Sequence, residues 1–120
     1  MAATTKKVPE KLILYEKWMD ATKWLMEKTA RFPKRLRYSL TMRVEDATLE
    51  ILESINRAAY TRDRSEALRS VNEGLNRLRV LIRLCNELHV FSDAEYGEAA
   101  GKVDEAGRIL GGWMKVEDAN

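Results

Sequence analysis

Apolar residues recur along the chain at steps of three and four, which is the spacing of one face of an α-helix. No stretch alternates apolar and polar residues with a period of two, as a half-buried strand would. The two prolines, Pro9 and Pro33, stand where helices are expected to begin, and proline suits the first helical position. The pattern predicts an all-α fold.

The apolar pattern divides into four helices joined by short loops. The expected helices span residues 9–30, 33–60, a segment that starts near 64 and a segment that starts near 93. Helices of this length with short connections favour an antiparallel up-down-up-down four-helix bundle. We expect one bundle domain over residues 9–117, with a flexible N-terminus at 1–8 and a C-terminal end at 118–120.

Each expected helix has an apolar seam that should face the core, and two helices have the spacing of a capping box at their start. The seams comprise Leu12, Tyr15, Met19, Thr22 and Met26; Leu36, Leu40, Val44, Ala47, Ile51, Ile55 and Ala58; Leu68, Val71, Leu75, Leu78, Ile82 and Cys85; and Tyr96, Ala99, Val103, Ala106, Leu110 and Trp113. Asp63 with Glu66, and Ser92 with Glu95, have the separation at which a side chain and a backbone N–H cap each other.

The third and fourth helices carry features that a lone bundle does not need. The third helix has further apolar residues beside its main seam, at Leu81, Leu84 and Leu88. The fourth contains glycines, each of which costs about 1 kcal/mol relative to alanine in a helix interior. Gly97 and Gly101 share one face, which favours close packing against a neighbouring subunit, whereas Gly111 and Gly112 fit a subunit contact and a fraying helix end equally well.

Composition places the chain among ordinary folded domains. The 120 residues are 45% hydrophobic and 33% charged, which suffices for one core and a solvated surface. Uninterrupted apolar runs are far shorter than the ~20 residues of a membrane-spanning helix. The single cysteine, Cys85, cannot form an intramolecular disulfide, which fits a reducing compartment. We therefore expect a cytoplasmic protein without a membrane segment.

The net charge of +2 hides an uneven distribution. Residues 31–91 carry twelve basic residues, eleven of them arginine, against eight acids, whereas residues 92–120 carry three basic residues against seven acids. A basic middle can present a strongly positive face although the whole chain is nearly neutral. Arginine is notable there because a guanidinium group forms two parallel hydrogen bonds with phosphate or carboxylate.

One stripe of the third helix, at steps of three and four, contains no acid. It consists of Arg62, Ser65, Arg69, Asn72, Asn76, Arg79, Arg83 and Asn86. The acids of the same helix, Glu66, Glu73 and Glu87, are expected on a different face. Such segregation favours an anionic partner for the helix-3 stripe. The alternative is that acids of the fourth helix or of a neighbouring subunit pair with these arginines.

A second basic segment surrounds the first turn of the chain. It consists of Arg31, Lys34, Arg35, Arg37 and Arg43, with no acid before Glu45. Positive charge at the start of a helix opposes the helix dipole, so helix stability does not explain it. Contact with phosphate is the functional interpretation. Tyr38 lies within the segment and has the chemistry to stack on a base, but a core or subunit contact is favoured for it.

Catalytic and metal-binding chemistry is poorly represented in the sequence. A di-iron bundle needs Glu-x-x-His pairs, but the single histidine, His89, has Asn86 three residues before it. Cys85 and His89 lie four residues apart on the expected third helix, yet Cys85 falls in a seam and is interpreted as a buried structural thiol. We expect neither an enzyme nor a cofactor.

Three motifs carry a family resemblance. They are Phe32-Pro33-Lys34, Leu78-Arg79 with Arg83, and Gly107-Arg108-Ile109-Leu110-Gly111-Gly112-Trp113. With these motifs in this order, the sequence resembles the accessory variability determinant (Avd) proteins of diversity-generating retroelements over nearly its whole length. The wider family comprises four-helix bundles related to proteins encoded in ribosomal RNA intervening sequences, with which the first motif is shared.

The resemblance implies a non-catalytic, homopentameric assembly of four-helix bundles with a positively charged surface. Such proteins bind nucleic acid and the reverse transcriptase of the element, and they support error-prone copying of a template RNA into cDNA for mutagenic retrohoming. The residues expected to bind nucleic acid are Arg79, Arg83, Arg69, Arg62, Lys34, Arg35, Arg37 and Arg43. The alternative function is an intervening-sequence-type bundle that acts only as a protein-interaction module, with its arginines used in subunit contacts.

Overall fold

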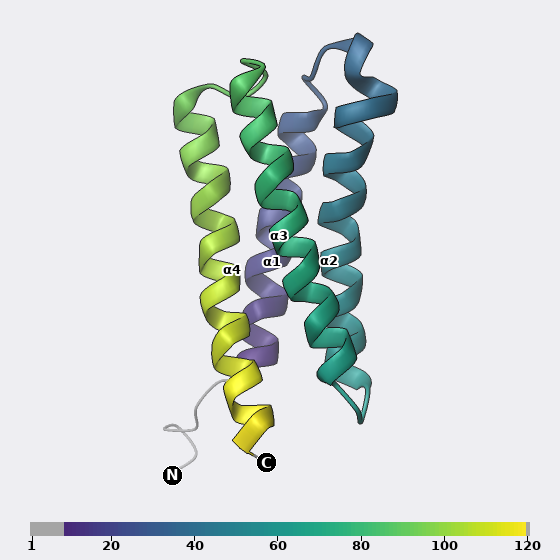
Figure 1. Ribbon diagram of the computed structural model, residues 1–120, viewed down its shortest axis with the longest axis vertical. Helices are drawn as coiled ribbons and strands as arrows, with labels where there is room; N and C mark the ends of the chain where they lie inside the picture. The colour runs from purple at the N-terminus through teal and green to yellow at the C-terminus, as the bar shows by residue number, and fades with distance from the viewer. Residues whose placement is uncertain (1–8, 120) are drawn as a thin grey trace.

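The computed structural model describes residues 9–119 as a bundle of four α-helices (Figure 1). Their bounds are α1 Glu10–Thr29, α2 Met42–Tyr60, α3 Ser65–Glu87 and α4 Asp93–Ala119. Successive helices run in opposite directions, and no strand occurs in this part of the chain. The prediction of an all-α four-helix bundle is confirmed. The expected flexible N-terminus at 1–8 lies outside the described residues, as does residue 120.

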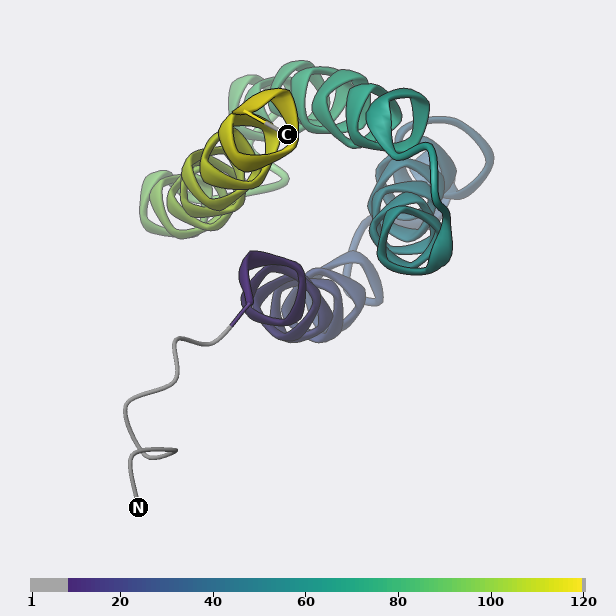
Figure 2. The same ribbon diagram turned by 90° about the horizontal axis from the view of Figure 1, so that it is seen from below.

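Each helix packs against its neighbours in the sequence, and α1 also packs against α4, which closes the bundle (Figure 2). The core lies between the four helices and is mainly apolar, with four threonines and one serine also buried: Thr22, Thr29, Thr41, Thr48 and Ser54. Across residues 9–119, no helix combines the length and the apolarity that crossing a membrane requires.

Two of the predicted seams are confirmed in full and a third almost so. All predicted seam residues of α3 are buried, as are those of the second helix from Leu36 to Ala58. In α4 the residues from Ala99 to Trp113 are buried, and Tyr96 is half-buried. A helix with a single apolar stripe has only one way to bury it, so the periodicity of the sequence identifies the core face.

The predicted seam of α1 is wrong. Its core face consists of Leu14, Trp18, Ala21, Thr22 and Leu25, of which only Thr22 belongs to the predicted seam. The other predicted residues are half-buried or, at Leu12, exposed. Apolar residues occur on two sides of α1. The side that carries Trp18 packs in the core, and the predicted side does not. The Trp18 ring is fully buried, and its Nε1 donates a hydrogen bond to the carbonyl oxygen of Thr48, 3.0 Å away, so its one polar atom is satisfied.

The predicted second helix does not begin as an α-helix. Pro33 is followed by a 3-10 turn, Lys34–Leu36, and by a π-helical turn, Arg37–Thr41, before α2 begins. The π turn closes hydrogen bonds over five residues instead of four. Two consecutive residues, Leu40 and Thr41, are therefore both buried, whereas the three residues before them are exposed.

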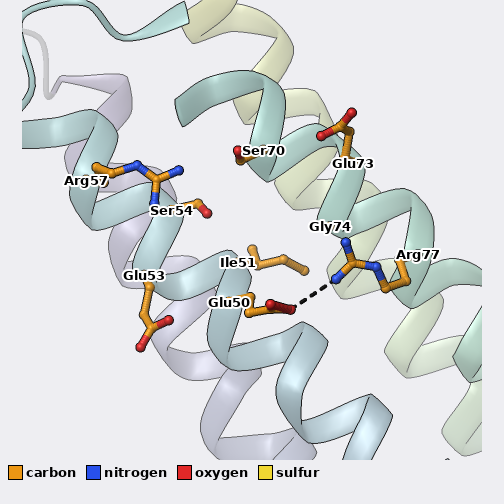
Figure 3. Close-up of a pocket in the computed structure, with 9 residues that line it drawn as sticks. All are labelled: Glu50, Ile51, Glu53, Ser54, Arg57, Ser70, Glu73, Gly74 and Arg77. Carbon is orange, nitrogen blue, oxygen red and sulfur yellow. Dashed lines mark hydrogen bonds and ion pairs between the residues drawn. The ribbon is translucent and has the colours of Figure 1, made fainter. Parts of the chain in front are cut away.

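A glycine sets the spacing of α2 and α3. A Cβ added at Gly74 would lie 2.6 Å from Cγ1 of Ile51, so the two helices approach more closely here than any other residue permits. A groove of about 300 Å³ lies between the two helices at this point. Figure 3 shows the residues that line it, with Gly74 and Ile51 among them. Charged side chains of both signs line the groove: Glu50, Glu53, Arg57, Glu73 and Arg77. An ion pair between Arg77 and Glu50, 3.0 Å long, spans it.

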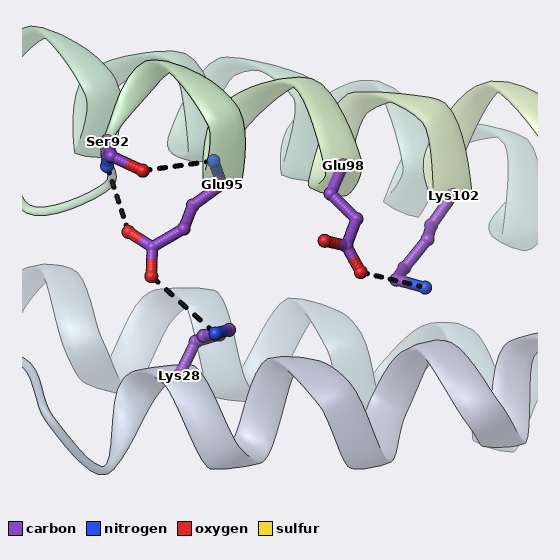
Figure 4. A network of polar contacts seen from close by, with 5 residues as sticks. All are labelled: Lys28, Ser92, Glu95, Glu98 and Lys102. Atoms are coloured by element: carbon purple, nitrogen blue, oxygen red, sulfur yellow. Dashed lines mark hydrogen bonds and ion pairs between the residues drawn. The ribbon is translucent and has the colours of Figure 1, made fainter.

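The two predicted capping boxes have opposite outcomes. At the start of α4 the box is confirmed, because Ser92 Oγ accepts a hydrogen bond from the backbone N–H of Glu95 at 3.1 Å and the Ser92 N–H donates to Glu95 Oε1 at 2.9 Å (Figure 4). At the start of α3 the predicted box is wrong. Asp63 instead accepts a hydrogen bond from the Ser65 hydroxyl, and no side chain caps this helix, which begins at Ser65.

The capping box should make a measurable contribution to stability. We expect Ser92→Ala to lower the free energy of unfolding by about 1 kcal/mol, because the Glu95 N–H loses its acceptor.

The hydrogen bond from the Ser92 N–H, with a smaller contribution from Lys28, lowers the pKa of Glu95. A lowered pKa stabilises the fold above the usual glutamate pKa, and this stabilisation is lost as the pH falls through the lowered value. The stability difference between wild type and Glu95→Gln should therefore shrink on acidification, as chemical denaturation at several pH values would measure; a constant difference would contradict this.

Cys85 and His89, which the sequence places on one helix, are separated by the end of α3. The helix ends at Glu87, so the prediction that His89 lies on it is wrong. His89 has a φ of 61°, and the N–H groups of His89 and Val90 donate to the carbonyls of Asn86 and Cys85 at 3.0 and 2.8 Å, a pattern that closes many helices. Cys85 is fully buried, and burial raises the pKa of its thiol to about 12. The thiol is therefore protonated near neutral pH, and its role is packing.

Candidate nucleic-acid interface

The turn between α1 and α2 gathers the second basic segment at one end of the bundle (Figure 1). We call this set the basic cluster; it consists of Arg31, Lys34, Arg35, Arg37 and Arg43. All five side chains are exposed, and none forms an ion pair within residues 9–119. Like charges that have no acidic partner repel one another and oppose the dipole of the following helix, so the stability of the fold does not account for them.

The backbone that carries the basic cluster is fixed to the rest of the bundle. Phe32, within the turn, packs edge to face against Phe91 of the α3–α4 loop, with ring centroids 5.4 Å apart. Glu45, the first acid after the basic cluster, accepts a hydrogen bond from the Thr29 hydroxyl at 2.7 Å. The cations are thus presented from an anchored turn, which limits the entropy lost when they bind an anionic partner.

The structure places Arg79 of the helix-3 stripe against α4. Its guanidinium donates to Asn76 Oδ1 at 2.8 Å and to Asp104 Oδ1 at 3.4 Å. Pairing with an acid of the fourth helix was the alternative to an anionic partner, and it holds for this arginine. Gly107 leaves room for the contact, since a Cβ there would lie 3.1 Å from Arg79 Nη2. This role of a glycine in the third family motif was not recognised from the sequence.

Arg83 also has an acidic neighbour. Its Nε lies 3.6 Å from Glu87 Oε2, one helical turn further along α3. The expectation that the acids of this helix lie on a different face is therefore wrong for Glu87. Both side chains are more than half exposed, so the pair contributes little to stability and Arg83 remains accessible.

The remaining stripe arginines, Arg62 and Arg69, are exposed and form no ion pair with any described residue. Arg62 lies in the α2–α3 turn, at the opposite end of the bundle from the basic cluster (Figure 1). The eight predicted residues thus do not form one site. Four of them join Arg31 in the basic cluster, and the other four are spread along α3 and the turn before it.

The described residues hold no group of three or more histidine, cysteine, aspartate or glutamate side chains that are placed to bind a metal ion. The α2–α3 groove of Figure 3 mixes acids with arginines. Since acids are in excess there, the groove repels a phosphate. The basic cluster is the surface best suited to an anionic polymer.

Comparison with protein families assigns the chain to a family. The chain belongs to the bAvd-like family, which it matches over residues 12–117. The match covers all four helices and the basic cluster. A search among curated proteins found no match.

Proposed function

We propose that the chain is a non-catalytic accessory protein of a diversity-generating retroelement. In this role it binds the template RNA or its cDNA together with the reverse transcriptase of the element, and it supports mutagenic cDNA synthesis and retrohoming in the cytoplasm. Membership of the bAvd-like family supports the role. The observation that carries the nucleic-acid part is the basic cluster, whose five cations are exposed and have no acidic partner in residues 9–119.

We further propose that the functional form is a homopentameric ring. Exposed apolar side chains support a subunit contact, namely Val80 and Leu84 of α3 and Leu88, which directly follows this helix. On α4, an added Cβ at Gly97 or Gly101 would meet no atom within 4 Å among the described residues beyond the adjacent helix backbone, which leaves room for the backbone of a neighbour. A ring also multiplies the basic cluster, and linked weak contacts can raise avidity by ~10²–10⁴.

The second candidate function is a protein-interaction module that does not bind nucleic acid. The observation that favours it is the ion pairing of Arg79 with Asp104 and of Arg83 with Glu87. These pairs show that part of the helix-3 stripe is engaged within the chain. They do not involve the basic cluster, whose arginines this alternative assigns to subunit contacts.

The salt dependence of RNA binding separates the two functions. Each phosphate contact with a single strand contributes roughly 0.7 to the fall of log affinity with log salt, so four contacts predict a slope of roughly −3. We expect fluorescence anisotropy with a labelled RNA of about 20 nucleotides to give at least this slope. Light scattering on the same sample should give about 69 kDa, five times the 13.8 kDa of the chain. Absence of binding, or binding that does not respond to salt, would favour the interaction module.

A further inference from the structure

Tyr38 lies in the middle of the basic cluster in the sequence, and its aromatic ring has no polar or aromatic partner within residues 9–119. Its side chain is 80% exposed, and it neither stacks on another ring nor forms a hydrogen bond within residues 9–119. Of the core or subunit contact favoured from the sequence, the core contact is therefore wrong, and the subunit contact stays a prediction. An exposed tyrosine ring leaves a large apolar face in water, and covering that face with a flat partner is favourable.

The exposure of Tyr38 follows from the backbone that carries it. The π turn Arg37–Thr41 buries its last two residues against the core and turns the first three outward, and Tyr38 is the central one of these three. Single π turns occur frequently at functional sites. The bulk of the ring is thus held on the outside of an anchored segment.

The neighbours of Tyr38 in the sequence are the cations of the basic cluster. Arg37 precedes it directly, and Lys34 and Arg35 lie in the 3-10 turn before that. An aromatic ring beside cations that have no acidic partner is the combination with which proteins hold single-stranded nucleic acid. The ring stacks on a base and the cations contact the flanking phosphates. A duplex offers the same phosphates but buries the faces of its bases.

We propose that Tyr38 stacks on an unpaired base, so that the basic cluster distinguishes single-stranded from double-stranded nucleic acid. This inference rests on the proposed function, since it requires that the basic cluster binds nucleic acid at all. It adds the class of ligand: an unpaired stretch of RNA or cDNA, recognised by the face of a base and not by its sequence.

The test compares Tyr38→Leu with Tyr38→Phe on two ligands, a single-stranded RNA and a fully paired, blunt-ended RNA duplex of the same length. Base stacking on an aromatic ring predicts about a tenfold loss of single-strand affinity for Tyr38→Leu and little loss for Tyr38→Phe. Duplex affinity and the salt slope should not change, because no charge is removed. Tyr60→Leu is the matched control: this tyrosine is 85% exposed at the other end of α2, and its replacement should leave both affinities unchanged.

Several results would overturn the inference while leaving the proposed function standing. One is that Tyr38→Leu binds the single-stranded RNA as tightly as the wild type. Another is that Tyr38→Leu loses affinity equally for both ligands. A third is that Tyr60→Leu loses as much single-strand affinity as Tyr38→Leu. A smaller mass by light scattering for Tyr38→Leu would also overturn it, because Tyr38 would then be a subunit contact. If the wild-type protein binds neither ligand, both the inference and the proposed function are wrong.

Discussion

Replacing Lys34, Arg35, Arg37 and Arg43 together by glutamine is expected to lower RNA affinity on the order of 10²–10³-fold at about 0.1 M salt. Each of these side chains is exposed and has no acidic partner within the described chain, so each is available to a phosphate. Removing four contacts should also make the slope of log affinity against log salt shallower by roughly 3. Anisotropy titrations at several salt concentrations measure both quantities.

A matched control separates local contact from overall charge. Lys11, Lys23, Arg108 and Lys115 are exposed cations outside the basic cluster, and replacing them by glutamine also changes the net charge from +2 to −2. This control variant should keep most of its affinity and its slope. Equal losses in the two variants would show that binding follows the net charge alone, and the basic cluster would then not be the interface.

The basic-cluster variant should fold as well as the wild type. The four side chains are exposed, and their charge opposes the dipole at the start of the second helix, so neutralising them removes a small repulsion. A loss of affinity can therefore be attributed to lost contacts when the free energies of unfolding agree. Arg79 and Arg83, which are also among the residues expected to bind nucleic acid, should contribute less, because each already has an acidic neighbour.

Gly74→Ala is expected to lower the free energy of unfolding by about 1–2 kcal/mol. Alanine is the better helix former by about 1 kcal/mol, but the added methyl group meets Ile51 at 2.6 Å in a packed core. The neighbouring atom is Cγ1, in the middle of a fully buried side chain, so it cannot move aside at small cost. Overpacking therefore outweighs helix propensity, as urea denaturation would measure.

A double-mutant cycle tests whether Ile51 is the cause. Ile51→Ala alone should cost about 2–4 kcal/mol through the cavity that it leaves. In the double variant the methyl group added at position 74 enters space that the Ile51 side chain has left. The destabilisation of the double variant should therefore be smaller than the sum of the two single destabilisations by about 1 kcal/mol or more, which is roughly the cost of overpacking. Additive costs would show that the destabilisation of Gly74→Ala arises elsewhere.

The sequence by itself determined the helices and most of their core faces. The seam of α2 and the main seam of α3 recur at steps of three and four along each helix, and every residue of these seams is buried. The capping box of Ser92 and Glu95 is equally local, because its partners lie three residues apart. The basic cluster is also continuous in the sequence, so its four predicted members were found before the fold was known.

Only the tertiary structure decided the orientation of α1 and the partners of the arginines. Apolar residues lie on two faces of α1, and the fit of the Trp18 ring against α2 selects one of them, a choice that depends on residues thirty positions away. Arg79 is separated from Asp104 by 25 residues and meets it because α3 and α4 are neighbours. The spacing of residues along the sequence indicates which of them share a face of a helix. Which residues that face contacts depends on how the helices pack against one another.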